Sequence, residues 1–357
     1  MTETGDWMTP KARMQALVSG APYDRIPCIP SLSDHAALVL GVTVAEYTRS
    51  ADLMIRGQIE AYRRYGHDAV GLGPGSTGIA EAAGSIVAFP EFNTPYVVDY
   101  VVKETSDLDR LVIPDPLTAG RFPQFLDALA GLVEALGDEV PIGLTLGGPV
   151  STASNLRSAE RFMRDIARDP DFAHRLLEYA LAITVPFVRE VARLPVGFTI
   201  VDPVSSGSLI GPAVYRDFAF PYQQRLIAAI IEASGRAPVL HVCGNTRRNW
   251  HLMADTGAGA LSLELSAIGS RSRGISVPPK RCFSGHRRWW MRTSRNACAR
   301  RGTARRGSFL RWDADCRSQR RLTISMRWLA PHGGMAGIRS IQDCSAGEVR
   351  RPARLRG

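Results

Sequence analysis

Residues 239–245 read VLHVCGN, and this segment gives the main clue to the fold. Val239–Val242 is a short apolar run of the kind that forms a strand buried in a parallel sheet. His241 and Cys243 are two positions apart, so period-two alternation places both side chains on one face of that strand. An apolar strand that ends in small and polar residues is typical of α/β proteins whose active site lies at the carboxyl ends of the strands.

Two further apolar runs end in the same way. Residues 142–146 are followed by GGP, and residues 198–201 are followed by DPVSS. Segments with helical spacing separate these runs, so strand, polar loop and helix alternate up to about Glu264. The pattern predicts an α/β fold, a (β/α)8 TIM-like barrel. The expected helices are Thr9–Gly20, Asp52–Tyr65, Pro123–Leu136, Ser158–Ala167, Pro170–Leu194, Pro212–Ala233 and Trp250–Gly257.

A doubly wound parallel sheet is the alternative fold. Such a sheet commonly carries a G-x-G-x-x-G loop between its first strand and helix. Residues 71–75 read GLGPG, which has a different spacing and places Pro74 where the amides of a helix N-terminus are needed. The barrel is therefore the favoured interpretation, and the short polar loops that follow its strands are where we expect the functional residues.

The composition is that of a globular enzyme. Hydrophobic residues make up 45% of the 357 residues, which is enough for a large core. The first residues contain no apolar run that resembles a signal peptide, and no stretch of about 18 apolar residues predicts a membrane span. Six cysteines in a chain of this length do not indicate a disulfide scaffold, so we expect a cytoplasmic location and no membrane partner.

The charge is distributed very unevenly. Residues 265–357 hold 22 basic residues against four acidic ones, whereas residues 1–264 hold 22 basic and 30 acidic residues. A mildly acidic segment of net charge −8 is thus joined to a tail of net charge +18. Four of the six cysteines and four of the six tryptophans also fall in the tail, which indicates that the two parts did not arise under one selected composition.

His241 and Cys243 are candidate zinc ligands. A neutral imidazole and a thiolate are both preferred ligands of zinc, and a catalytic site usually adds one more protein ligand and an open position. The alternative interpretation is a buried structural cysteine beside a structural histidine. Cys28 lies in an apolar segment and is expected to belong to the core.

Several motifs, in this order along the chain, resemble the uroporphyrinogen-decarboxylase superfamily over residues 9 to about 264. Within it, the His-x-Cys-Gly pattern resembles the corrinoid methyltransferase branch. True decarboxylases of the superfamily carry an arginine-containing segment near the N-terminus, whereas residues 30–34 here read PSLSD. The motifs are ARM at 12–14, GAPYDRIP at 20–27, GHDAV at 66–70, AEAAG at 80–84, GGP at 147–149, DPVSS at 202–206, YRDF at 215–218 and HVCGN at 241–245.

The resemblance implies a zinc-dependent methyltransferase. It implies that His241 and Cys243 hold zinc, which binds a thiol such as coenzyme M or a similar acceptor. The thiolate then takes a methyl group from a methylated corrinoid on a partner protein. Three residues near strand ends, Glu81, Asp202 and Asn245, are predicted to orient the substrate or the ligands. Uroporphyrinogen decarboxylase activity on the same fold is the alternative function.

Two residues are predicted to contribute to cofactor binding. Gly148 and Ser205 both lie in loops that follow predicted strands. For Gly148, shaping of the loop is the alternative interpretation.

The third zinc ligand of the branch, a cysteine in a Gly-Cys-x-x-Pro motif, does not occur in the expected place. Reading the codons of residues 312–317 with a displacement of one base permits Leu-Gly-Cys-Gly-Leu-Pro, which fits that motif. We therefore expect a frameshift between Leu263 and Gly274, an incomplete barrel domain over 1–264 and a disordered, out-of-frame tail over 265–357. Cys316 is not expected to be the ligand, because its codon belongs to the other frame.

A basic tail that binds nucleic acid is the remaining alternative. Arginines interleaved with tryptophans can contact phosphates and stack on bases. The tail matches no folded nucleic-acid-binding module, and reading GC-rich DNA out of frame also yields arginine-rich sequence. The frameshift is the interpretation that the composition favours.

Overall fold

The computed structural model describes residues 6–264, 273–277, 309–311, 324–329 and 335–341. The chain divides into two units, one of Met1–Glu264 with Gly274–Ser284 and the other of Leu265–Arg273 with Gly285–Gly357. In the second unit, strands β9 (Phe309–Arg311), β10 (Ile324–Leu329) and β11 (Met335–Ile341) form an antiparallel sheet. Most of the tail that we expect to be disordered, including Cys316, lies outside the described residues.

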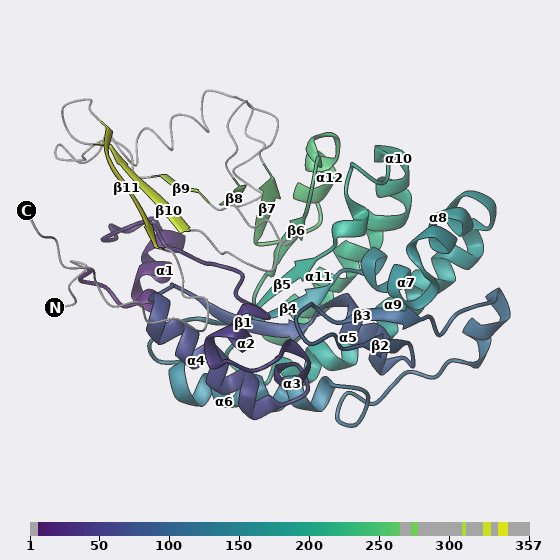
Figure 1. Ribbon diagram of the computed structural model, residues 1–357. Helices are drawn as coiled ribbons and strands as arrows, with labels where there is room; N and C mark the ends of the chain where they lie inside the picture. The colour runs from purple at the N-terminus through teal and green to yellow at the C-terminus, as the bar shows by residue number, and fades with distance from the viewer. Residues whose placement is uncertain (1–5, 265–272, 278–308, 312–323, 330–334, 342–357) are drawn as a thin grey trace, which may run out of the picture. The chain divides into compact units, whose positions relative to one another are not determined.

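A six-stranded sheet forms the centre of the first unit (Figure 1). Its order is β1-β4-β5-β6-β7-β8, and the pairs β1–β4, β4–β5, β5–β6 and β6–β7 are parallel. The predicted α/β class with a parallel sheet is thereby confirmed. The strands are β1 (Val70–Pro74), β4 (Ile142–Gly147), β5 (Gly197–Val201), β6 (Val239–Val242), β7 (Ala260–Glu264) and β8 (Arg273–Val277).

Helices connect the parallel strands and pack beside them, with α4 and α6 along β1 (Figure 1). The α-helices are α1 (Pro10–Ser19), α2 (His35–Leu40), α3 (Val44–Tyr47), α4 (Ala51–Tyr65), α5 (Gly75–Ala82), α6 (Phe122–Leu136), α7 (Pro149–Arg157), α8 (Ala159–Arg168), α9 (Pro170–Val191), α10 (Pro212–Val214), α11 (Phe220–Ser234) and α12 (Trp250–Ala254). Shorter turns are η1 (Thr105–Arg110), η2 (Pro203–Ser205), the π-helix η3 (Tyr215–Ala219) and η4 (Arg247–Asn249), and a hairpin joins β2 (Ile86–Ala88) to β3 (Tyr96–Asp99).

Local signals explain where the predicted helices begin and end. The Thr9 hydroxyl accepts a hydrogen bond from the Ala12 amide at 3.2 Å and so caps α1. Gly66 ends α4 in the left-handed conformation, where its amide bonds the Tyr62 carbonyl. No described helix is both long and apolar enough to cross a membrane.

Three helical segments differ from the sequence prediction. Residues 75–82 and 149–157 form helices α5 and α7, although their Gly- and Pro-rich starts predicted loops. Pro149 occupies the first turn of α7, where its missing N–H costs nothing. The expected helix Pro212–Ala233 is interrupted by η3, because Pro221 has no N–H to donate to the turn before it.

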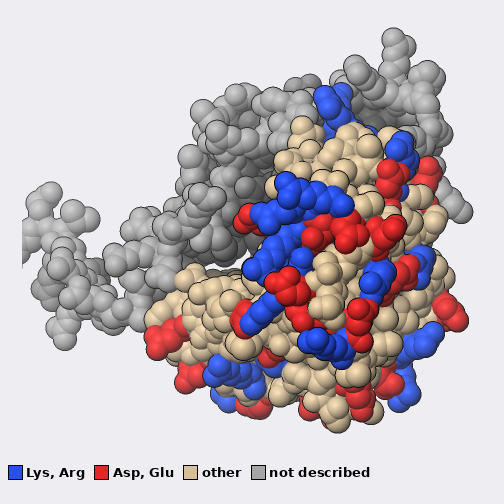
Figure 2. All heavy atoms as spheres, turned by 90° about the vertical axis from the view of Figure 1, so that its right-hand side faces the viewer, with Lys and Arg blue, Asp and Glu red and all other residues tan. Residues whose placement is uncertain are grey.

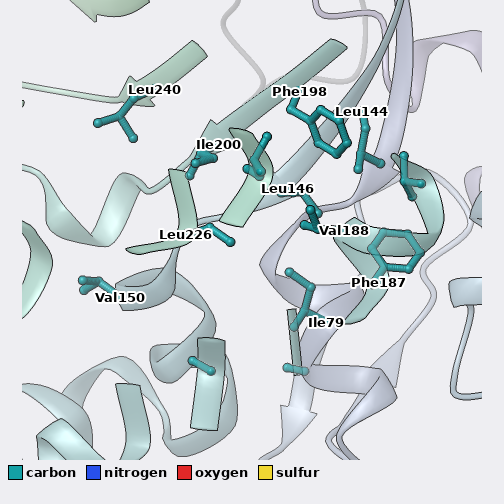
Figure 3. Packing of buried hydrophobic residues seen from close by; sticks show 14 of the residues in the cluster. Ile79, Leu144, Leu146, Val150, Phe187, Val188, Phe198, Ile200, Leu226 and Leu240 are labelled. Atoms are coloured by element: carbon teal, nitrogen blue, oxygen red, sulfur yellow. The ribbon is translucent and has the colours of Figure 1, made fainter. Parts of the chain in front are cut away.

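The core lies between the sheet and the helices that cover it. Leu144 and Leu146 of β4, Phe198 and Ile200 of β5, and Leu240 of β6 are all nearly inaccessible to solvent (Figure 3). Each such side chain stabilises the fold by about 2 kcal/mol through removal of apolar surface from water. This packing fixes the carboxyl ends of β4, β5 and β6 next to one another.

A buried ion network lies at the opposite, amino end of β1. The Arg13 guanidinium is 1% exposed and donates hydrogen bonds to both carboxylate oxygens of Asp24, at 2.6 and 2.8 Å, and to Asp68. The Arg13 hydrogen bonds hold the pKa of the Asp24 carboxyl well below its usual range. Because the active site of a barrel forms at the carboxyl ends of its strands, residues at the amino end contribute to stability.

His67 is buried beside this network, where it is 2% exposed and packs edge-on against Tyr62. Its Nδ1 atom has no hydrogen-bond partner. Burial lowers the pKa of His67 to about 4, although the neighbouring Asp68 opposes this shift. The folded protein therefore holds His67 as a neutral side chain at neutral pH.

We expect the free energy of unfolding to rise as the pH increases from about 4 to about 6.5. In this window the unfolded chain binds a proton at His67 that the folded chain excludes. The substitution His67→Phe should remove a contribution on the order of 2 kcal/mol to that rise. Urea unfolding at several pH values checks this, and identical pH slopes for the two proteins would contradict it.

Candidate functional site

His241 and Cys243 lie at the carboxyl end of β6. The parallel register pairs Val201 with His241 and His241 with Ser262, so this strand end is flanked by β5 and β7. Both side chains are half-buried. The structure thus brings the two predicted ligands to the end of the sheet where a barrel enzyme forms its active site.

The two side chains are close enough to act on one ligand. The Nε2 atom of His241 lies 2.9 Å from Sγ of Cys243, and its Nδ1 lies 2.9 Å from the Ser262 hydroxyl. In a tetrahedral zinc site the distance between such N and S ligands is about 3.5 Å, so the pair needs to open only slightly. Ser262 holds the imidazole at Nδ1 and leaves Nε2 facing the thiol, as a partner of a metal-bound histidine does.

The pair fits zinc as two of its ligands. In the part of the chain that the structure describes, no three His, Cys, Asp or Glu side chains gather as a metal-binding group. A zinc enzyme needs at least one more protein ligand. The described residues alone therefore supply an incomplete set of ligands.

Asp202, which follows β5, is fully buried. Its Oδ1 accepts hydrogen bonds from the amide and the hydroxyl of Ser151, at 2.8 and 2.6 Å, and its Oδ2 accepts one from the Gln223 amide at 2.8 Å. Burial raises the pKa of the Asp202 carboxyl, while the hydrogen bonds from Ser151 and Gln223 lower it. With no exposed surface, this carboxylate does not face a substrate directly.

Gly148 is necessary for this arrangement. A Cβ atom at position 148 would overlap the Asp202 carboxyl group. The Gly148 backbone amide also donates a hydrogen bond to the Val201 carbonyl at 2.9 Å, which joins the residue after β4 to the end of β5. Both of these contacts show Gly148 shaping the loop between β4 and α7.

Ser205 and Asn245 lie on two loops that touch. The Ser205 hydroxyl is buried, donates to the Asp202 carbonyl at 2.7 Å and accepts from Gln223 at 3.0 Å. The Asn245 side chain is exposed, and the Asn245 backbone N–H donates a hydrogen bond to the Ser208 hydroxyl at 3.1 Å. Asn245 is therefore accessible next to Cys243, whereas Ser205 is enclosed in the network around Asp202.

Glu81 lies in helix α5 and not in a loop after a strand. Its carboxylate accepts a hydrogen bond from Arg121 at 2.7 Å, and both side chains are largely buried. The Arg121 guanidinium also lies over the rings of Phe89 and Phe125, at 4.6 and 5.5 Å. These contacts give Glu81 a structural partner, and nothing described links it to His241.

Three residues of the site were not predicted from the sequence. Ser151 and Gln223 bind the Asp202 carboxylate from helices α7 and α11, and Ser262 holds His241 from β7. Ser262 could have been found, because it occupies the alternating position of the strand next to His241. Gln223 carries no such signal, since it lies 21 positions from Asp202 in an ordinary amphipathic helix.

A sequence model of the uroporphyrinogen decarboxylase (URO-D) family matches residues 9–282. The chain belongs to the URO-D family. This confirms the predicted family and explains why its motifs occur in order along the first unit.

Curated relatives of this URO-D family chain include two kinds of enzyme. The methylcobamide:CoM methyltransferases MtbA of Methanosarcina mazei and MtaA of Methanosarcina barkeri are each 28% identical to it. The matches cover 72% and 75% of this chain, and 76% and 79% of those proteins. A uroporphyrinogen decarboxylase of Myxococcus xanthus is 24% identical over 69% of this chain and 71% of its own length. The chain is therefore an enzyme by ancestry.

A solved structure of a methyltransferase from Methanosarcina mazei shows the same fold. It matches with a TM-score of 0.64 and 28% identity, over 71% of this chain and 76% of that chain. The parallel sheet with its helices is thus of the TIM-barrel type, as predicted, and the resemblance to the methylcobamide methyltransferase branch is confirmed.

We expect the substitution Gly148→Ala to destabilise the protein by about 1–3 kcal/mol, because the new methyl group must displace the Asp202 carboxyl. The matched control is Gly143→Ala in the preceding strand β4, where a Cβ would meet nothing closer than 3.9 Å. Urea unfolding of both variants checks the prediction. Equal stability of the two variants would show that Asp202 can move without cost.

Proposed function

We propose that the first unit is the catalytic domain of a methyltransferase that moves a methyl group from a methylated corrinoid to a thiol. The observation that carries this proposal is the His241–Cys243 pair, with Nε2 and Sγ 2.9 Å apart at the carboxyl end of β6. Relatives named methylcobamide:CoM methyltransferases support it. We place the reaction in the cytoplasm, with a corrinoid protein as partner.

His241 and Cys243 would hold a zinc ion. When bound there, zinc lowers the pKa of a thiol substrate so that it reacts as a thiolate near neutral pH. Coenzyme M or a similar small thiol is the proposed acceptor. The thiolate sulfur forms the new bond to the methyl carbon, and the electron pair of the broken cobalt–carbon bond stays with the corrinoid.

The chain's own residues orient this chemistry. Ser262 holds Nδ1 of His241, which directs Nε2 towards the site. Asn245, exposed in the loop directly after Cys243, is in a position to contact the acceptor. We propose no direct contact with substrate for Asp202 or Ser205, because both are buried.

We also propose that the third ligand is a cysteine hidden by the frameshift, so that the chain as written binds zinc weakly. Inserting one base between codons 263 and 274 should restore that cysteine and raise zinc affinity on the order of 100-fold or more. Zinc content after dialysis measures this. The control is a three-base insertion at the same place, which keeps the present frame, and one equivalent of zinc on the chain as written would refute the frameshift.

In the frame-restored protein, Cys243→Ala and His241→Ala should each abolish zinc retention and the demethylation of methylcobalamin by coenzyme M, which is followed by absorbance. Cys28→Ala, a half-buried cysteine outside the site, is the matched control and should retain both properties. A zinc-loaded protein that leaves methylcobalamin intact with every thiol tested would contradict the proposed function. Turnover of a porphyrinogen without metal would support the decarboxylase instead.

A further inference from the structure

A buried network around Asp202 joins the segments that follow β4 and β5 to helix α11. Ser151, in the helix after β4, donates two hydrogen bonds to the Asp202 carboxylate. Gln223 of α11 donates to the same carboxylate at 2.8 Å and to Ser205 at 3.0 Å, and Tyr215 donates its hydroxyl to Gln223 at 2.5 Å. All five side chains are shielded from solvent.

The backbone of Asp202 extends this network to the reactive strand. Its amide donates a hydrogen bond to the His241 carbonyl at 3.0 Å, one residue beyond the last paired position of β5. Asp202 is thus bonded to Ser151 and Gln223 through its side chain and to His241 of β6 through its backbone. A shift of the Asp202 backbone has to move this strand end or break the bond.

The loop that follows Asp202 is in close contact with the loop that follows Cys243. A Cβ at Gly244 would lie 2.7 Å from the Ser206 hydroxyl and 2.9 Å from that of Ser208. The Asn245 amide donates to Ser208, and a Cβ at Gly207 would overlap the Asn245 carbonyl. The two loops fit so closely that a displacement of residues 206–208 would be transmitted to residues 243–245.

We infer that Asp202 is a positioning residue, which acts through Ser151, Gln223 and the 206–208 loop to hold His241 and Cys243 in place. A catalytic role by direct contact is incompatible with its complete burial. A buried carboxylate whose oxygens accept hydrogen bonds from several donors resists displacement, because every lost bond leaves an unsatisfied polar group. The inference rests on the proposed function only in taking His241 and Cys243 as the reactive pair.

The test measures how fast Cys243 is alkylated, relative to Cys28 in the same molecule. Iodoacetamide is added to the full chain, and mass spectrometry quantifies the tryptic peptides 237–247 and 26–49, which carry the two cysteines. The ratio removes effects of global unfolding, which would expose both thiols. It needs neither metal nor substrate.

We expect Asp202→Asn to raise the Cys243-to-Cys28 ratio about threefold or more, because the contact between residues 206–208 and 243–245 loosens locally. Ser151→Ala removes only one hydroxyl from the carboxylate and should raise the ratio in the same direction. If Asp202→Asn does not fold, the alkylation ratio of Ser151→Ala tests the inference in its place. Thr184→Ala is the matched control, since it removes a buried hydroxyl of α9 that bonds the Ala180 carbonyl outside the network.

An unchanged ratio in the folded Asp202 and Ser151 variants would overturn the inference, as would a rise of equal size in Thr184→Ala. Failure of the proposed function looks different. In that case methylcobalamin and coenzyme M remain unreacted in the frame-restored protein, whatever the alkylation ratio is. A raised ratio together with absent methyl transfer would therefore support the positioning role and reject the methyltransferase.

Discussion

The parallel register between β5 and β6 is the constraint on which the site depends. It pairs Val201 with His241 and thereby lets the next amide, that of Asp202, donate to the His241 carbonyl. The side chains of successive residues in a strand point to opposite faces, so a slip of one position would turn both His241 and Cys243 away from Ser262 and from the face they now share. The apolar core beneath the strands holds this register, because Ile200 and Leu240 are completely buried.

Burial of a carboxylate beside the reactive strand end is costly unless hydrogen bonds compensate it. Ser151 and Gln223 provide this compensation from two different helices, and Gly148 leaves the space that the carboxyl group needs. The same requirement explains why α7 and α11 each direct a polar side chain to the residue that follows β5. The exterior is organised differently. The face shown in Figure 2 mixes acidic and basic side chains, and exposed ion pairs such as Arg225–Glu178 contribute little to stability.

Much of the fold could be predicted because its signals are local. The apolar runs that became β4, β5 and β6, the cap at Thr9 and the stop at Gly66 each lie within a few residues of the element they define. The proximity of His241 and Cys243 followed from strand alternation alone. The π-helix before Pro221 was missed, since the interruption depends on how a whole turn accommodates an absent N–H.

The site was harder to predict where its contacts join distant segments. Asp202 was identified from its place after a strand, but its burial depends on Ser151 and Gln223, which are 51 and 21 positions away. Glu81 was expected in a loop, yet it lies in a helix and pairs with Arg121, 40 positions along the chain. Such partners become visible only when the helices are placed around the sheet.

X-ray absorption at the zinc edge of the frame-restored protein tests the central claim most directly. Our account predicts one imidazole nitrogen at about 2.0–2.1 Å and sulfur at about 2.3 Å. It also predicts that Cys243→Ala removes one sulfur and that His241→Ala removes the imidazole. Zinc surrounded by oxygen alone, or a ligand shell that neither substitution changes, would show that His241 and Cys243 do not form the metal site.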